Sequence, residues 1–249
     1  MKPYNCPICD TPSNLLDVVD FNKNCEERRG TFLPKSGIPI YYAACVCCGF
    51  VFAPEFLNWT DDEFIKKIYN ANYLVIDPDY ALTRPSTNAD LINKIFAVDR
   101  DKIRHLDYGG GNGMLSNKLV AHGWNSISYD PFPDVGQSFS NLGCFNLITA
   151  FEVFEHVPNP LSLMDNLSQL VEKEGLIFFS TLINDNNIKL EKRLDWWYAS
   201  PRNGHISLYS LKSLKKLGEK FGFRFASMGV GYHLYFKSFP PWANALLSK

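Results

Sequence analysis

A glycine-rich turn with acidic residues on both sides is the part of the sequence best suited to chemistry. It reads Asp107-Tyr-Gly-Gly-Gly-Asn-Gly113, and Asp130 follows 17 positions after Gly113. Its glycines permit a tight turn and let a ligand lie against bare backbone near a helix N-terminus. A carboxylate at Asp130 can accept both hydroxyls of a ribose. We therefore expect a nucleotide-type cofactor to be bound by these residues: Asp107, Tyr108, Gly109, Gly111, Gly113 and Asp130.

The acid before the glycines distinguishes two classes of cofactor. A dinucleotide carries a pyrophosphate, which a carboxylate at Asp107 would repel. S-adenosylmethionine has no phosphate but carries an amino group and a sulfonium, which the same carboxylate attracts. The Asp-x-Gly-x-Gly-x-Gly pattern therefore favours S-adenosylmethionine. A P-loop is excluded because no Gly-Lys-Ser/Thr follows the turn.

Four of the seven cysteines have the spacing of a metal site. They form two pairs with two residues between the members: Cys6, Cys9, Cys45 and Cys48. Two such turns supply four thiolates to one tetrahedral ion, which predicts a closed structural zinc site. The alternatives are free buried cysteines or a redox pair. A redox pair of the thioredoxin type should begin a helix within a βαβ unit, and neither pair has that setting.

The candidate catalytic residues follow two predicted strands. Phe151 and Glu152 come directly after one strand, and we expect them to line the methionine side of the cofactor. His205 lies in an aromatic and polar loop, 195–210, which we expect to border the substrate cavity. A neutral imidazole there could accept a proton from a substrate, and His156 is the second candidate base. The alternatives are a surface role for Glu152 and purely structural roles for the two histidines.

Composition narrows the class of protein. The chain has 249 residues with 25 basic and 26 acidic side chains, giving a net charge of −1. This balance weighs against a dedicated nucleic-acid binder, which needs a surplus of Lys and Arg. No apolar run reaches the roughly 18 residues of a membrane span, and no signal segment is apparent at the start. We therefore expect a cytoplasmic protein without a membrane span.

The expected secondary structure that positions these residues differs between three parts of the chain. Residues 1–56 are predicted to be a zinc-binding ribbon, 57–100 a helical linker or lid with an irregular stretch at 70–88, and 101–249 the cofactor-binding domain. After residue 102, strands alternate with helices, which predicts a mostly parallel sheet covered on both faces. Strands are expected at 103–106, 125–129, 145–150 and 176–180, a closing hairpin at 223–227 and 232–236, and helices at 60–69, 91–96, 114–122, 160–171 and 210–221.

From about Lys102 to Phe236, the chain resembles the class I S-adenosylmethionine-dependent methyltransferases. The turn through Gly113 is similar to their first motif, Tyr129-Asp130 to the acidic end of their second strand, and the run 145–156 to their fourth-strand motif. The resemblance implies a doubly wound, Rossmann-like α/β fold and S-adenosylmethionine as cofactor. Only 14 residues separate Asp130 from Phe145, where the family has a third strand and a helix.

The resemblance is strongest to the branch with ubiquinone-type and sugar methyltransferases, and a four-cysteine zinc module is similar to that of deoxysugar C-methyltransferases. It implies methyl transfer to a small-molecule substrate such as a sugar or nucleotide-linked sugar. Two alternatives stay open: an RNA or protein methyltransferase that uses the ribbon to bind its substrate, and a catalytically silent binding module. The sequence does not indicate the oligomeric state.

Overall fold

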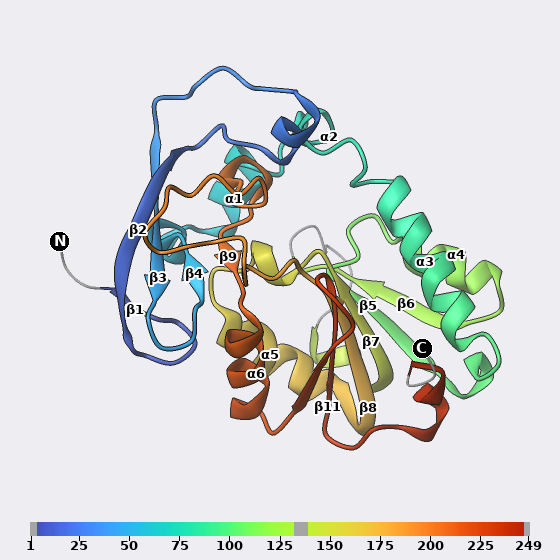
Figure 1. The fold of residues 1–249 in the computed structure, drawn as a ribbon. Coiled ribbons are helices and arrows are strands. Elements are labelled where there is room, and N and C mark those ends of the chain that lie inside the picture. Colours follow the sequence, from blue (N-terminus) through green and yellow to red (C-terminus); the bar gives the residue numbers. More distant parts are fainter. Residues whose placement is uncertain (1–3, 132–138, 247–249) are drawn as a thin grey trace.

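The computed structural model describes residues 4–131 and 139–246, which form two β-sheets (Figure 1). The smaller sheet has the order β1-β2-β3-β4-β9 and the larger has the order β10-β11-β8-β7-β5-β6. The strands of the smaller sheet are β1 (Tyr4–Asn5), β2 (Pro12–Asp20), β3 (Pro39–Cys45), β4 (Val51–Phe52) and β9 (Ser207–Leu208). Those of the larger sheet are β5 (Arg104–Tyr108), β6 (Asn125–Tyr129), β7 (Phe145–Phe151), β8 (Val171–Ser180), β10 (Arg224–Ser227) and β11 (Tyr232–Phe236).

The larger sheet has the topology that creates a binding crevice. Strands β6, β5, β7 and β8 are parallel, and the closing hairpin of β10 and β11 pairs antiparallel with β8. From β5 the chain passes to β6 on one side and then to β7 on the other, so the strand order reverses beside β5. Ligands bind at such a switch point, outside the carboxyl ends of the strands. The α/β, Rossmann-like fold expected from the sequence is confirmed.

Helices cover both faces of this sheet. Helices α3 (Thr83–Phe96) and α4 (Met114–Ala121) pack on one face, and α5 (Pro160–Leu170) and α6 (Leu211–Lys220) on the other (Figure 1). Successive residues of β7 enter opposite cores, since Leu147 packs with α3 and α4 while Ile148 packs with α5 and α6. Both faces of the strands are therefore buried, which explains why they read as continuous apolar runs.

Helix ends mostly follow their sequence signals. Thr60 caps α1 (Asp61–Lys67) in the expected capping box with Glu63, and Ser210 caps α6. The expectation that 70–88 is irregular is wrong, because this stretch contains α2 (Tyr73–Ile76) and the start of α3. Pro85 lies in the first turn of α3, where a proline is tolerated because the backbone N–H has no partner within the helix.

The smaller sheet contains four strands from the N-terminal part of the chain and one from the C-terminal part. Strand β9 pairs with β4 through Val51 and Leu208, so a strand from the C-terminal part completes the sheet expected from residues 1–56 alone. On β3, Tyr42 packs with α1, α2 and the loop before β9, whereas Ala43 faces the core beneath α5 and α6. The domain boundaries at 56 and 100 stay predictions.

The connection between β6 and β7 is short. Its described residues contain the turn Phe139–Asn141 and no strand, and residues 132–138 lie outside the described part of the chain. The other 3-10 turns are Cys25–Arg29, Pro54–Asn58, Arg100–Lys102, Phe154–His156, Pro201–Asn203 and Pro241–Leu246. Across 4–131 and 139–246, the structure contains no helix with both the length and the apolar character needed to cross a membrane.

Candidate active site

A cavity of about 630 Å³ opens at the switch point of the larger sheet. This volume lies within the range of small-molecule sites, about 300–1,000 Å³. Its walls come from the turns after β5, β6 and β7, from α5, and from the segment that carries α1, α2 and the start of α3. Seven of the eight predicted cofactor residues line it: Asp107, Tyr108, Gly109, Gly111, Asp130, Phe151 and Glu152. Their role in binding stays a prediction.

The turn after β5 requires glycines, because it has no room for side chains and uses left-handed backbone conformations. Gly109, Gly111 and Gly113 have φ of 74°, 55° and 74°, in the left-handed region that glycine tolerates best. Gly113 does not line the cavity; it precedes the first residue of α4. Sequence reasoning missed Gly110, where a Cβ would lie 2.2 Å from Oγ of Ser128. Only the fit to the neighbouring strand reveals this requirement.

Asp130 joins the ends of β5 and β6. Its Oδ2 accepts a hydrogen bond of 2.8 Å from the backbone N–H of Gly111. The carboxylate therefore holds the glycine turn in place while lining the same cavity. This is the position from which a carboxylate can reach the hydroxyls of a ribose.

A buried hydrogen-bond chain fixes Asp107, which is 4% exposed. The hydroxyl of Thr149 donates to Asp107 Oδ1 at 2.8 Å and lies 3.0 Å from Nε2 of His105. Burial lowers the pKa of His105 to about 3, so the ring is neutral; its Nε2–H donates to Thr149 and its Nδ1 accepts from Ser126 at 2.7 Å. Burial raises the pKa of Asp107 to about 7, although the Thr149 hydrogen bond opposes this shift.

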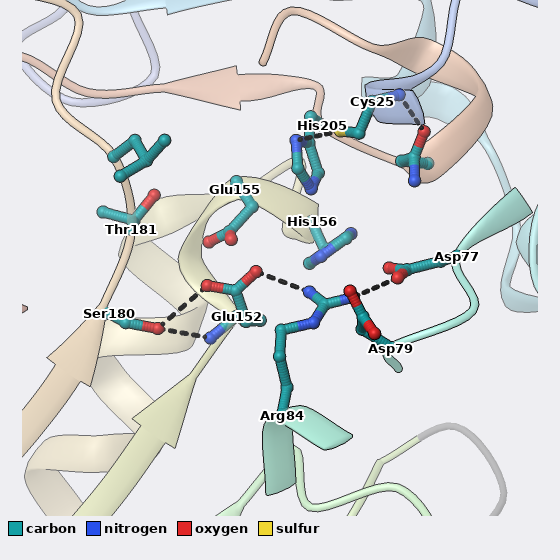
Figure 2. A network of polar contacts seen from close by, with 12 residues as sticks. Cys25, Asp77, Asp79, Arg84, Glu152, Glu155, His156, Ser180, Thr181 and His205 are labelled. Atoms are coloured by element: carbon teal, nitrogen blue, oxygen red, sulfur yellow. Dashed lines mark hydrogen bonds and ion pairs between the residues drawn. The ribbon is translucent and has the colours of Figure 1, made fainter. Parts of the chain in front are cut away.

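An ion-pair cluster connects the end of β7 to α3 (Figure 2). Glu152 has a positive φ of 55°, and its Oε2 lies 2.7 Å from Nη1 of Arg84. Nη2 of the same guanidinium binds Oδ1 of Asp77. The hydroxyl of Ser180 accepts from the backbone N–H of Glu152 at 2.9 Å and donates to its Oε1 at 3.1 Å. These bonds hold a backbone conformation that non-glycine residues rarely adopt.

The two candidate bases differ in their access to the cavity. His156 lines the cavity, and its Nδ1 lies 3.0 Å from the hydroxyl of Tyr69. His205 is 3% exposed, and its Nδ1 lies 3.0 Å from the carbonyl oxygen of Tyr198. No described residue of 195–210 lines the cavity, which corrects the expectation that this loop borders it. The loop instead packs behind His156 and Tyr69.

Glu155 is buried beside His156 (Figure 2). It is 0% exposed, and its Oε1 accepts a hydrogen bond of 2.5 Å from the hydroxyl of Tyr198. Its Oε2 is also buried and has no hydrogen-bond partner. Burial raises the pKa of Glu155 to about 8, and the nearby charge of Glu152 adds to this shift. One oxygen of Glu155 and one nitrogen each of His156 and His205 lie within 4.8 Å of one another.

The four paired cysteines converge at one end of the smaller sheet. Their sulfurs lie 3.6 Å apart for Cys6 and Cys48, 3.4 Å for Cys9 and Cys45, and 3.7 Å for Cys9 and Cys48. Four sulfurs at about 2.3 Å from a tetrahedral zinc ion would be about 3.8 Å apart. The donor set therefore fits zinc. None of the four lines the cavity.

Comparisons with known proteins identify a family that matches this chain and relatives that match part of it. The sequence model of a family described as methyltransferase domain matches residues 80–227. The ubiquinone biosynthesis O-methyltransferase of Colwellia psychrerythraea is 34% identical over 100 residues, covering 31% of this chain and 41% of that protein. The corresponding protein of Vibrio parahaemolyticus is 45% identical over 107 residues, covering 34% and 45%. The matched region thus spans less than half of these two relatives.

Among solved structures, the chain resembles the 1,6-didemethyltoxoflavin-N1-methyltransferase of Burkholderia thailandensis. The identity is 12% and the TM-score 0.48, over 77% of this chain and 96% of that one. An O-methyltransferase family protein of the same organism gives 13% identity and a TM-score of 0.44, over 73% and 60%. Likenesses of this strength support no inference about function.

Replacing Thr149 with valine tests the buried chain that holds Asp107. Valine keeps the shape but removes the hydroxyl, leaving His105 Nε2 and Asp107 Oδ1 without that partner. Loss of a buried partner costs about 1–3 kcal/mol, so urea unfolding at pH 7 should show a decrease of this size in the free energy of unfolding. Thr87→Val, the same exchange at an exposed site on α3, should change it by less than about 0.5 kcal/mol. Equal stability of Thr149→Val and the parent would contradict the prediction.

Proposed function

The chain belongs to the methyltransferase-domain family of S-adenosylmethionine-dependent enzymes, and we propose from this premise that its cavity binds that cofactor and transfers its methyl group to a small-molecule acceptor. One observation carries the proposal. The glycine turn and Asp130 line the same cavity at the switch point, and a backbone hydrogen bond joins them. The Asp107-x-Gly-x-Gly-x-Gly113 pattern selects a cofactor without phosphate.

The lining residues indicate an orientation for the cofactor. We propose that Asp130 binds the ribose and that the backbone of Gly109 and Gly111 approaches the cofactor closely. A Cβ at Gly109 would lie 2.5 Å from Val153, so the turn is pressed against the end of β7. The methionine part would then lie between Asp107 and Phe151, with its positive charges facing the buried carboxyl group. When bound, the cofactor supplies a methyl group activated by the sulfonium.

The rest of the cavity suits a small acceptor. Beyond the glycine turn it is lined by aromatic side chains from the segment with α1 and α2: Tyr69, Tyr73 and Tyr80. Holding acceptor and methyl close and aligned supplies much of the catalysis in such a displacement. We propose His156 as the base that receives the acceptor's proton, since it lines the cavity and His205 does not. A sugar or nucleotide-linked sugar as acceptor stays a narrower prediction.

We also propose that the four paired cysteines bind one structural zinc ion. The support is the convergence of four sulfurs at distances that fit a tetrahedral site. Closed all-thiolate sites contribute folding energy and leave no open position for catalysis. The ion would thus stabilise the smaller sheet and take no part in methyl transfer.

Asp130→Ala tests the cofactor site. The variant loses the carboxylate that would accept the ribose hydroxyls, and hydrogen bonds to a charged group contribute about 1.5–3 kcal/mol. Calorimetry should therefore show S-adenosylmethionine and S-adenosylhomocysteine binding at least about tenfold more weakly. Glu174→Ala, an exposed acid at the start of β8, should leave both affinities unchanged. Binding of NAD instead, or an unchanged affinity of Asp130→Ala, would show that the proposal is wrong.

The affinity should also depend on pH through Asp107. Because burial raises its pKa to about 7, the carboxyl group is largely neutral at pH 6 and largely ionised at pH 8. An ionised carboxylate attracts the sulfonium and a neutral one does not, so the dissociation constant of S-adenosylmethionine should decrease as the pH rises from 6 to 8. Asp107→Asn should bind about as tightly as the parent at pH 6 and show a flatter profile. An equally steep profile in this variant would assign the titration to another group.

The zinc proposal predicts one zinc ion per chain by elemental analysis. Cys9→Ser should lower this content, because it removes one of the four thiolates. Cys47→Ser is the matched control: it lies between two predicted ligands but outside the cluster, so it should retain the ion. Chelation should increase hydrogen exchange in residues 4–56 and leave cofactor binding largely intact. A metal-free protein with an equally protected N-terminal region would contradict the proposal.

A further inference from the structure

We propose that Tyr69 is a further catalytic residue, whose hydroxyl passes the acceptor's proton to His156. This inference rests on the proposed function. Tyr69 follows α1 and His156 follows β7, yet both line the cavity and Oη lies 3.0 Å from Nδ1. The pair thus joins the two walls of the site. Sequence spacing gave no sign of it, since the two residues are 87 positions apart.

The relay requires one particular direction of this hydrogen bond, with both groups neutral. Burial raises the pKa of Tyr69, so its hydroxyl keeps its proton. Burial also lowers the pKa of His156 to about 3, and the charge of Arg84 adds to this shift, so the ring is neutral. In the relay Tyr69 donates to Nδ1, and the ring proton of His156 lies on Nε2.

The loop behind the pair holds it in place. A Cβ at Gly204 would lie 2.7 Å from Oη of Tyr69 and 2.9 Å from Nδ1 of His156, so only a glycine allows this close approach. Nη1 of Arg202 donates to the carbonyl of Ile68 at 3.0 Å. The hydroxyl of Tyr73, whose ring packs edge-on against Tyr69, donates to the carbonyl of Asn203 at 3.1 Å. The loop predicted to border the substrate thus frames the relay from behind.

The proton and charge balance is simple. As the acceptor oxygen forms its bond to the methyl carbon, the carbon–sulfur bond breaks and its electron pair stays on sulfur as a neutral thioether. The acceptor's O–H proton passes to Oη of Tyr69 while the Tyr69 proton passes to Nδ1 of His156. Tyr69 ends neutral, and the positive charge that began on sulfur ends on the imidazolium of His156.

Nearby groups determine whether that imidazolium can form (Figure 2). Arg84 opposes it, but both Glu152 and Asp77 bind Arg84 and offset its charge. Glu155 is fully buried, and one of its carboxylate oxygens lies within 4.8 Å of a nitrogen of each histidine. Burial raises the pKa of Glu155 to about 8, so its carboxyl group is mostly protonated at pH 7 and offsets the transient charge only as it ionises.

Tyr69→Phe tests the relay in the whole 249-residue chain. It removes only the hydroxyl, so S-adenosylmethionine should bind with unchanged affinity while kcat for methylation of catechol falls about 10²- to 10⁴-fold. With 4-nitrocatechol at pH 8, where the acceptor is already ionised, the loss should nearly disappear because no proton has to move. Tyr235→Phe is the control, since it loses a buried hydroxyl–carbonyl bond of 2.6 Å outside the cavity. Full activity of Tyr69→Phe on catechol would overturn the relay.

A second measurement needs no acceptor. In protein with ¹⁵N-labelled histidine, the His156 signals, assigned by their absence in His156→Asn, should show a neutral ring protonated on Nε2. The Nδ1 signal should move downfield in Tyr69→Phe as its hydrogen bond is lost. A ring protonated on Nδ1 would overturn the proposal even if neither catechol is methylated. Failure to bind S-adenosylmethionine would instead reject the proposed function, so the two failures are distinguishable.

Discussion

The ion pair between Arg84 and Glu152 connects the two halves of the site. Glu152 belongs to the end of β7, and Arg84 to the helix that follows the N-terminal segment. Through this contact, and through Asp77 on the same guanidinium, the segment with α1 and α2 covers the switch point of the sheet. The same segment carries Tyr69, which the loop with Arg202 and Gly204 also holds opposite His156. The bridge therefore joins two walls of the cavity.

Much of the large sheet could be predicted from local patterns. Its parallel strands are apolar runs, and helices with capping residues or terminal glycines separate them. The Thr60 and Ser210 caps formed as expected because a cap involves only neighbouring backbone groups. The glycine turn and Asp130 were also readable, because a strand, a turn and a helix in that order place both at one edge of a parallel sheet.

The parts that the sequence did not reveal depend on contacts between distant segments. Gly110 is required by Ser128 on the neighbouring strand, and Tyr69 gains its significance only from His156. His205 attracted attention because its loop follows β8 and is rich in aromatic and polar residues. The structure shows that those aromatic residues fill the core beside the smaller sheet instead. Composition does not distinguish a loop that lines a cavity from one that supports it.

The pairing of β4 with β9 has a consequence for the order in which the chain folds. The four paired cysteines all precede residue 49, so they leave the ribosome long before Leu208, which pairs with Val51 at the edge of the same sheet. A contact between positions so far apart closes a very long loop, and such contacts form slowly. During synthesis the growing sheet therefore exposes β4 as an unpaired edge, which is a template for wrong pairing with another chain. A strand of only two residues, Val51–Phe52, keeps that edge short until its partner arrives.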